Sequence, residues 1–286
     1  MKQTVKCLPC YLNAAINCMD RAGFDRSRQY ELCYQLLPEL EAQPLSGTPC
    51  ENASRFLHAA YEKMGVTDPF EREKKLSNDL ALSLLPRLRS ILDNSSDRLH
   101  MALRLAAAGN IIDLAIFDSV DVLPAIDHCI KHDFALSDYP LFREQLISAK
   151  DVLICGDNAG EIVFDTLLVQ ELQSLGKSVT YMVKSGPIMN DATLIDAEQA
   201  GMTQLCPVVT TGMAEMGFNR KNATPETLEY FDRADLIIAK GQANFEGLDD
   251  APFAGGKIYF LLKLKCSAIC QYVGAELSDV IFLHKK

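Results

Sequence analysis

The second half of this sequence alternates between short apolar runs and longer helical patterns, and this alternation restricts the possible folds more than any other feature. The apolar runs that predict buried strands lie at 152–155, 178–183, 204–210, 235–239, 257–262 and 280–283. The helices expected between them span 161–175 and 225–233. Short buried strands that alternate with helices are typical of a mostly parallel sheet covered on both faces. The predicted fold class is therefore α/β, layered as an α/β/α sandwich.

The first third of the sequence has helical periodicity and no strand pattern. The expected helices begin at Tyr11 and then span 28–37, 52–64, 69–85 and 99–108, followed by 126–147 with a break near residues 139–140. Asp68 and Pro69 are typical of the cap and first position of a helix. The segment 28–37 is expected to end before Pro38, with a loop at 38–49. We therefore predict a helical amino-terminal domain over residues 1–98 and an α/β domain over residues 99–286.

Charge and hydrophobicity argue against several classes of protein. The 286-residue chain has a formal net charge of -10 and no basic run, which argues against nonspecific nucleic-acid binding. No segment approaches the roughly 18 apolar residues of a membrane helix, and the sequence has no signal-peptide pattern. We therefore expect a cytoplasmic protein with reduced thiols and with no nucleic-acid or membrane partner. No pattern in the sequence specifies an oligomeric state.

Polar clusters follow three of the predicted strands, at the carboxyl ends where open parallel sheets bind ligands. They span 156–161, 184–192 and 240–246. In the first cluster, Asp157 and Asn158 either supply hard oxygen donors for a divalent ion, beside a helix amino terminus that favours an anion, or only cap the start of that helix. In the other two, Asp191 is either another hard ligand or a helix cap, and Lys240 is either a phosphate contact or a solvated lysine. In a parallel sheet the three clusters converge on one site.

These motifs resemble those of the damage-control phosphatase family, long called domain of unknown function eighty-nine. The resemblance covers nearly the whole chain and rests on the runs 7–10, 108–113, 156–165, 184–191, 240–246 and 260–266. The amino-terminal pair Cys7 and Cys10 is similar to the prokaryotic branch of the family. Ala243 departs from the glycine that the family usually has at that place. The resemblance implies an α-helical amino-terminal region preceding an α/β/α sandwich.

The resemblance also implies the residues of the site. A divalent ion, namely Mn, Co, Ni or Mg, is expected to be held by Asp157, Asn158 and Asp191. The family lines its substrate pocket at positions that correspond to Asn110, Asp113 and Lys240. Further contacts to the substrate are expected from Glu161, Lys184, Asn244 and Glu246. The expected catalytic residues are Asp157, Asn158 and Lys240, with Asp157 acting either as a metal ligand only or as a nucleophile.

These residues predict a metal-dependent phosphatase, a phosphoric monoester hydrolase that acts on sugar phosphates or damaged phosphorylated metabolites. Catalysis of that reaction rests mainly on positioning and charge stabilisation, with an ion that lowers the pKa of a bound water. Two alternatives stay open, an S-adenosylmethionine-dependent carboxyl methyltransferase and a noncatalytic protein that binds a metal or another ligand. Neither a Walker A loop nor a Gly-x-Gly-x-x-Gly fingerprint occurs.

Four cysteines form a second candidate for metal binding. Cys7 and Cys10 have the spacing of a ligand pair, and Cys266 and Cys270 would share one face of a helix. Four thiolates can hold a structural zinc ion. The spacing of the second pair is a loose match to such sites, so reduced and partly buried thiols are the favoured interpretation.

Overall fold

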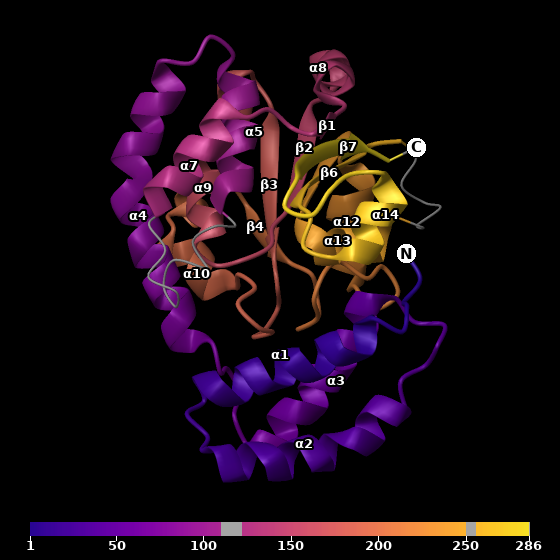
Figure 1. The fold of residues 1–286 in the computed structure, drawn as a ribbon. Coiled ribbons are helices and arrows are strands. Elements are labelled where there is room, and N and C mark those ends of the chain that lie inside the picture. The colour runs from indigo at the N-terminus through magenta and orange to yellow at the C-terminus, as the bar shows by residue number, and fades with distance from the viewer. Residues whose placement is uncertain (110–121, 250–255, 286) are drawn as a thin grey trace.

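A computed structural model of the chain describes residues 1–109, 122–249 and 256–285. Figure 1 shows an upright sheet with helices on both of its faces and a separate group of three helices below it. The helices in the described part of the chain are α1 (Cys7–Arg21), α2 (Arg26–Glu41), α3 (Pro49–Met64), α4 (Glu71–Asp93), α5 (Arg98–Ala108), α7 (Val122–Lys131), α8 (Tyr139–Ser148), α9 (Glu161–Ser174), α10 (Leu194–Gln199), α11 (Met202–Leu205), α12 (Pro225–Arg233), α13 (Gly241–Leu248) and α14 (Ser267–Val273). None of the helices in this part is long and apolar enough to cross a membrane.

The sheet of the described residues has seven strands in the order β1-β7-β6-β5-β2-β3-β4. They are β1 (Leu136–Ser137), β2 (Asp151–Cys155), β3 (Ser178–Val183), β4 (Val208–Thr210), β5 (Leu236–Lys240), β6 (Ile258–Lys263) and β7 (Val280–His284). The pairs from β6 through β5, β2 and β3 to β4 are all parallel, whereas β7 pairs with β6 in the antiparallel sense. The prediction of a mostly parallel sheet is confirmed. The carboxyl ends of β2, β3, β5 and β6 therefore share one edge.

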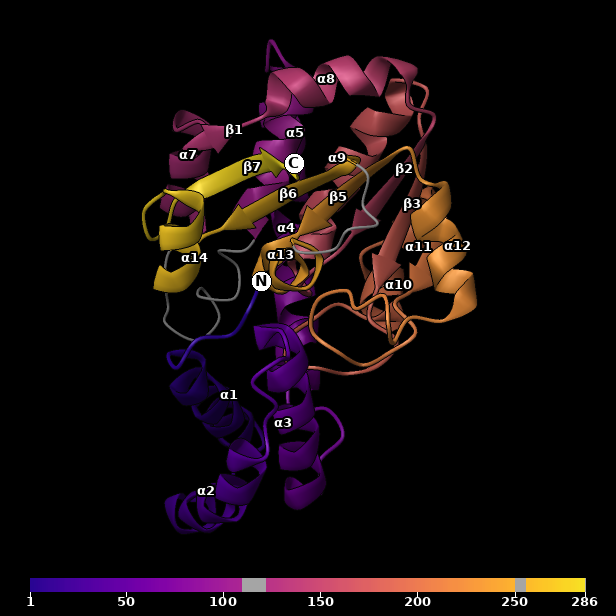
Figure 2. The same ribbon diagram turned by 90° about the vertical axis from the view of Figure 1, so that its right-hand side faces the viewer.

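Alternation along the strands divides the core between the two faces of the sheet. Ile154 of β2 packs in a cluster with residues of α4, α5 and α9, and its neighbour Leu153 packs in a second cluster with residues of α12, α13 and α14. The three layers of the predicted α/β/α sandwich are thus present. Figure 1 shows the two sets of helices on opposite sides of the strands, and Figure 2 shows the strands side by side from β7 to β3.

Helices α1, α2 and α3 have a hydrophobic core of their own. It contains Met19, Leu32 and Phe56, and it also takes in Ile188 from the loop after β3. This core therefore attaches the amino-terminal helices to the carboxyl edge of the sheet. Helix α4 lies before the predicted domain boundary at residue 98, yet Leu88 packs in the same cluster as α5 and α9. The division into 1–98 and 99–286 stays a prediction.

Two helices continue past prolines at which the sequence pattern predicts their ends. Helix α2 includes Pro38 and helix α4 includes Pro86. A proline inside a helix costs about 3 kcal/mol, but each fully buried leucine contributes about 1.5–3 kcal/mol. Beyond Pro86 the helix buries Leu88 and Leu92, which offsets that cost. The other departures are local: β1 precedes α8 in the segment expected to be one broken helix, and only 208–210 of the segment 204–210 forms a strand.

Candidate active site

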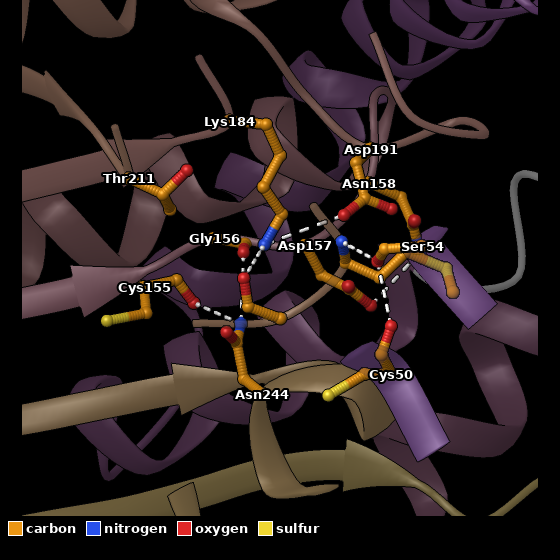
Figure 3. A network of polar contacts seen from close by, with 12 residues as sticks. Cys50, Ser54, Cys155, Gly156, Asp157, Asn158, Lys184, Asp191, Thr211 and Asn244 are labelled. Atoms are coloured by element: carbon orange, nitrogen blue, oxygen red, sulfur yellow. Dashed lines mark hydrogen bonds and ion pairs between the residues drawn. The ribbon is translucent and has the colours of Figure 1, made fainter. Parts of the chain in front are cut away.

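The loops after β2 and β3 are joined by backbone hydrogen bonds, and this brings the predicted metal ligands together. The amide of Ala159 donates to the carbonyl of Asn190 at 2.9 Å, and the amide of Ala192 donates to the carbonyl of Asp157 at 2.8 Å. Asn158 and Asp191 form an isolated antiparallel bridge. The side chains of Asp157, Asn158 and Asp191 therefore come from adjacent strand ends and face the same space, as Figure 3 shows.

The start of α13, directly after β5, supports Asp157 from the other side. Gly241 has a φ of +79°, and a Cβ at this residue would lie 2.0 Å from Oδ2 of Asp157. The absence of a side chain thus lets the carboxylate of Asp157 rest against the first turn of α13. Asn244 reinforces the contact, because its Nδ2 donates to the carbonyls of Lys240 at 2.7 Å and Gly156 at 3.1 Å. Asn244 therefore holds the ends of β2 and β5 together.

Buried carboxylates give this site its electrostatic character. Burial raises the pKa of Asp157 well above its ordinary value, and the negative charges of Glu161 and Asp191 raise it further. Burial likewise raises the pKa of Asp191 to about 6, although Lys184 opposes that shift. A nearby cation would oppose both shifts by stabilising the charged carboxylates.

The donor set of the site fits a hard divalent cation. Oδ2 of Asp191 is buried and accepts no hydrogen bond from the described residues, and the Lys184 ammonium lies 3.5 Å from it. Nδ2 of Asn158 donates a hydrogen bond to Oδ2 of Asp157 at 3.1 Å. The carboxamide oxygen of Asn158 is therefore the atom that could coordinate a metal ion. Carboxylate and carboxamide oxygens are the ligands that Mg²⁺ and Mn²⁺ prefer. No group of three or more His, Cys, Asp or Glu side chains in the described ranges is arranged to hold a metal ion, and this trio contains only two carboxylates.

Lys240 lies behind the site. Its side chain is fully buried, and its ammonium contacts Glu161 at 2.6 Å and Asp165 at 2.5 Å. Burial acts to lower the pKa of Lys240, but Asp165 and Glu161 outweigh that effect and raise it. The hydroxyl of Tyr181 completes the network by donating to Asp165 at 2.6 Å. In this arrangement Lys240 balances the charge of the carboxylates on α9.

A cavity of about 340 Å³ opens between the sheet edge and the amino-terminal helices. The predicted site residues that line it are Asp157, Asn158, Asp191 and Glu246. Those that do not line it, although all are buried, are Glu161, Lys184, Lys240 and Asn244. Two further predicted residues, Asn110 and Asp113, lie outside the described residues.

Three lysines that no sequence motif placed in the site also line the cavity, and two of them, Lys263 and Lys265, come from the end of β6. Lys263 is the last residue of β6, and Lys265 follows two residues later. In the described part of the chain neither ammonium has a hydrogen-bond or ion-pair partner, and the charge of Lys265 lowers the pKa of Asp157. The signal that would have found them is the fourth parallel strand end, since β6 ends at the same edge as β2, β3 and β5.

Three of the four candidate thiols line the same cavity. Cys7 and Cys10 of α1 line it together with Cys266, and each of these three cysteines is free, as is the buried Cys270. A hydrogen bond of 3.3 Å from Lys6 to Ser267 connects the start of α1 to the start of α14. A structural metal at these cysteines stays a prediction.

Sequence and structural comparisons place the chain in a family. A family model described as the damage-control phosphatase ARMT1-like domain matches residues 4–281. The chain belongs to this family. The membership confirms the resemblance carried by the motifs and supports a phosphatase role. The assignment to the prokaryotic branch through Cys7 and Cys10 stays a prediction.

Damage-control phosphatases of two archaea are similar to this member over much of its length. PH1575 of Pyrococcus horikoshii is 30% identical over 291 residues, which cover 100% of this chain and 99% of the relative. A relative from Archaeoglobus fulgidus is 30% identical over 234 residues, or 80% of each chain. The crystal structure of the duf89 family protein ph1575 from Pyrococcus horikoshii has a TM-score of 0.91 at 28% identity and covers 100% of both chains.

Proposed function

We propose that this protein is a metal-dependent phosphatase that hydrolyses small phosphomonoesters such as sugar phosphates or damaged phosphorylated metabolites. The observation that carries the proposal is that one cavity contains two kinds of group. These are the side-chain oxygens of Asp157, Asn158 and Asp191 and the unpaired ammonium groups of Lys263 and Lys265. The donors suit a divalent cation and the lysines suit an anion. A phosphomonoester requires both, and the family supplies the phosphatase role.

The divalent ion would be Mn²⁺, Co²⁺, Ni²⁺ or Mg²⁺, held by Asp157, Asn158 and Asp191. When bound, such an ion neutralises charge on the phosphoryl oxygens and lowers the pKa of a coordinated water. Two contacts hold these three ligands in place. They are the backbone bridge between Asn158 and Asp191 and the contact of the Asp157 carboxylate with Gly241.

The lysines at the end of β6 would bind the phosphoryl group. Lys265 is the stronger candidate, because its charge already acts on Asp157, and Lys263 lines the same cavity. Two ammonium groups balance the charge of a phosphate dianion. Lys240 would act indirectly, by holding Glu161 and Asp165 in their buried positions. The cavity of about 340 Å³ is near the lower end of the range of small-molecule sites and favours a small metabolite.

The proposal is tested with purified protein, a panel of phosphorylated metabolites and 4-nitrophenyl phosphate, assayed with each of the four ions and with a chelator. Phosphate release should require the ion, and Asp157→Asn and Asp191→Asn should each abolish it. Asp232→Asn is a matched control, because Asp232 is an exposed carboxylate on α12 paired with Arg220, and it should retain full activity.

Each alternative function has its own outcome. Turnover that survives both the chelator and the two substitutions would refute the metal site. Binding of S-adenosylmethionine without any phosphate release would favour the methyltransferase. Metal binding at Asp157 and Asp191 without turnover of any phosphate ester would favour a noncatalytic protein.

A further inference from the structure

Glu246 is a buried carboxyl group in the cavity that the proposed chemistry does not yet use. The residue lines the cavity and is 8% exposed. Its Oε1 accepts a hydrogen bond of 3.1 Å from Nε2 of Gln242. Among the described residues no lysine, arginine or histidine forms an ion pair with it, in contrast to the buried carboxylates on α9. A buried carboxyl group that forms no ion pair favours its neutral, proton-bearing form.

The ionisable groups near Glu246 include one ammonium and three groups on α1 and α3 that carry no charge near pH 7. The Met1 ammonium donates to the backbone carbonyl of Glu246 at 3.0 Å. Burial raises the pKa values of Cys10 and Tyr11 on α1 and of Cys50 on α3. Neighbouring negative charges, among them that of Glu246, raise these pKa values further. These three groups are therefore neutral near pH 7. Burial raises the pKa of Glu246 to about 7, while the amide of Gln242 and the ammonium of Met1 oppose the shift.

The fold places Glu246 in the cavity of the expected reaction centre, on the helix that contacts Asp157. Helix α13 starts at Gly241, against the carboxylate of Asp157, and Glu246 follows five residues later. A rise of about 1.5 Å per residue puts it roughly 7–8 Å along the axis, and helical side chains lean back towards the amino terminus. The Glu246 carboxyl thus lines the same cavity as Asp157, Asn158 and Asp191, farther along α13.

We propose that Glu246 is the general acid that protonates the leaving alcohol. The inference rests on the proposed phosphatase function. The phosphorus–oxygen ester bond breaks, its electron pair stays on the alcohol oxygen, and that oxygen takes the proton of Glu246. The attacking water forms the new phosphorus–oxygen bond. Both protons of the water leave on the phosphate product, which releases one of them to solvent. The Glu246 carboxylate then takes a proton from solvent.

This role identifies the substrates as phosphate esters of aliphatic alcohols. An aliphatic alkoxide is a strong base and a poor leaving group, so its departure gains greatly from a proton donor. General acid catalysis typically contributes about 10²–10⁴-fold. A nitrophenolate is weakly basic and departs without a proton, so its ester does not require Glu246.

The test compares two substrates on Glu246→Gln, a substitution that keeps the shape of the side chain and removes the acidic proton. For glycerol 3-phosphate, kcat/KM should fall by about 10²–10⁴-fold, whereas 4-nitrophenyl phosphate should be hydrolysed at nearly the wild-type rate. Glu73→Gln, at a buried carboxylate of α4 paired with Arg21, controls for the loss of a buried charge and should not change the ratio of the two rates.

Equal losses on both substrates would overturn the proposal, because they indicate a role in binding or folding. An unchanged rate on glycerol 3-phosphate would also overturn it. If Glu246→Gln fails to fold, the wild-type protein provides the test: rates across alkyl and aryl phosphates should depend only weakly on the basicity of the leaving group, and a steep dependence would overturn the role. If the wild-type protein does not hydrolyse 4-nitrophenyl phosphate, the phosphatase function itself fails, which is a different outcome from a failure of the role of Glu246.

Discussion

Replacement of Gly241 by alanine tests whether the backbone of α13 positions the carboxylate of Asp157. The new Cβ would lie 2.0 Å from Oδ2 and 2.2 Å from Cγ of Asp157, whereas unbonded atoms normally stay about 3.5 Å apart. The carboxylate must therefore move by more than about an ångström. A misplacement of that size near a reaction centre costs about 100-fold in rate. The positive φ of +79° adds a second cost, about 1–2 kcal/mol of folding stability for a residue with a Cβ.

Gly176 separates these two effects. It follows α9 with a φ of +76°, and a Cβ there would meet nothing within 4 Å. Gly176→Ala should lower the melting temperature by a few degrees and leave activity intact, since about 1 kcal/mol shifts a domain of this size by roughly 2–4 °C. Gly241→Ala should lower the melting temperature similarly and also weaken Mn²⁺ binding, measured by calorimetry, and reduce phosphate release about 100-fold. Unimpaired Mn²⁺ binding and turnover in Gly241→Ala, or an equal loss of activity in Gly176→Ala, would refute this explanation.

Two further predictions concern buried ionisable groups. Lys240→Met leaves Glu161 and Asp165 buried without their cation and should reduce the free energy of unfolding in denaturant by about 3–5 kcal/mol. Tyr181→Phe removes one hydrogen bond to Asp165 and should cost only about 1.5–3 kcal/mol, so an equal or larger loss would contradict the charge argument. Hydrolysis of glycerol 3-phosphate should decline as pH rises through about 7, because Glu246 then loses its proton. The ratio of that rate to the rate on 4-nitrophenyl phosphate should not change with pH in Glu246→Gln, and a decline that persists there would contradict the assignment to Glu246.

The sequence pattern predicted the sheet more successfully than the ends of the helices. The buried runs at 152–155 and 235–239 match β2 and β5 almost residue for residue, because an apolar run between polar clusters is a local signal. The end of α4 depends on distant partners instead. Leu88 and Leu92 stabilise the helix beyond Pro86 only because α5 and α9 are there to bury them, and no local pattern contains that information.

The amino-acid sequence by itself determined that Asp157, Asn158 and Asp191 would meet. Asp157 and Asn158 come just after β2, and Asp191 lies in the loop after β3, while strand direction follows from the order of strands and helices along the chain. Only the tertiary structure decided which lysines face the cavity. Lys240 follows β5 in the same way, yet Glu161 and Asp165 enclose it behind the site, while Lys263 and Lys265 line the cavity unpaired. The physical reason is that the partner of a charge is set by distance in space: Lys240 and Asp165 are 75 residues apart in the sequence and touch only in the folded protein.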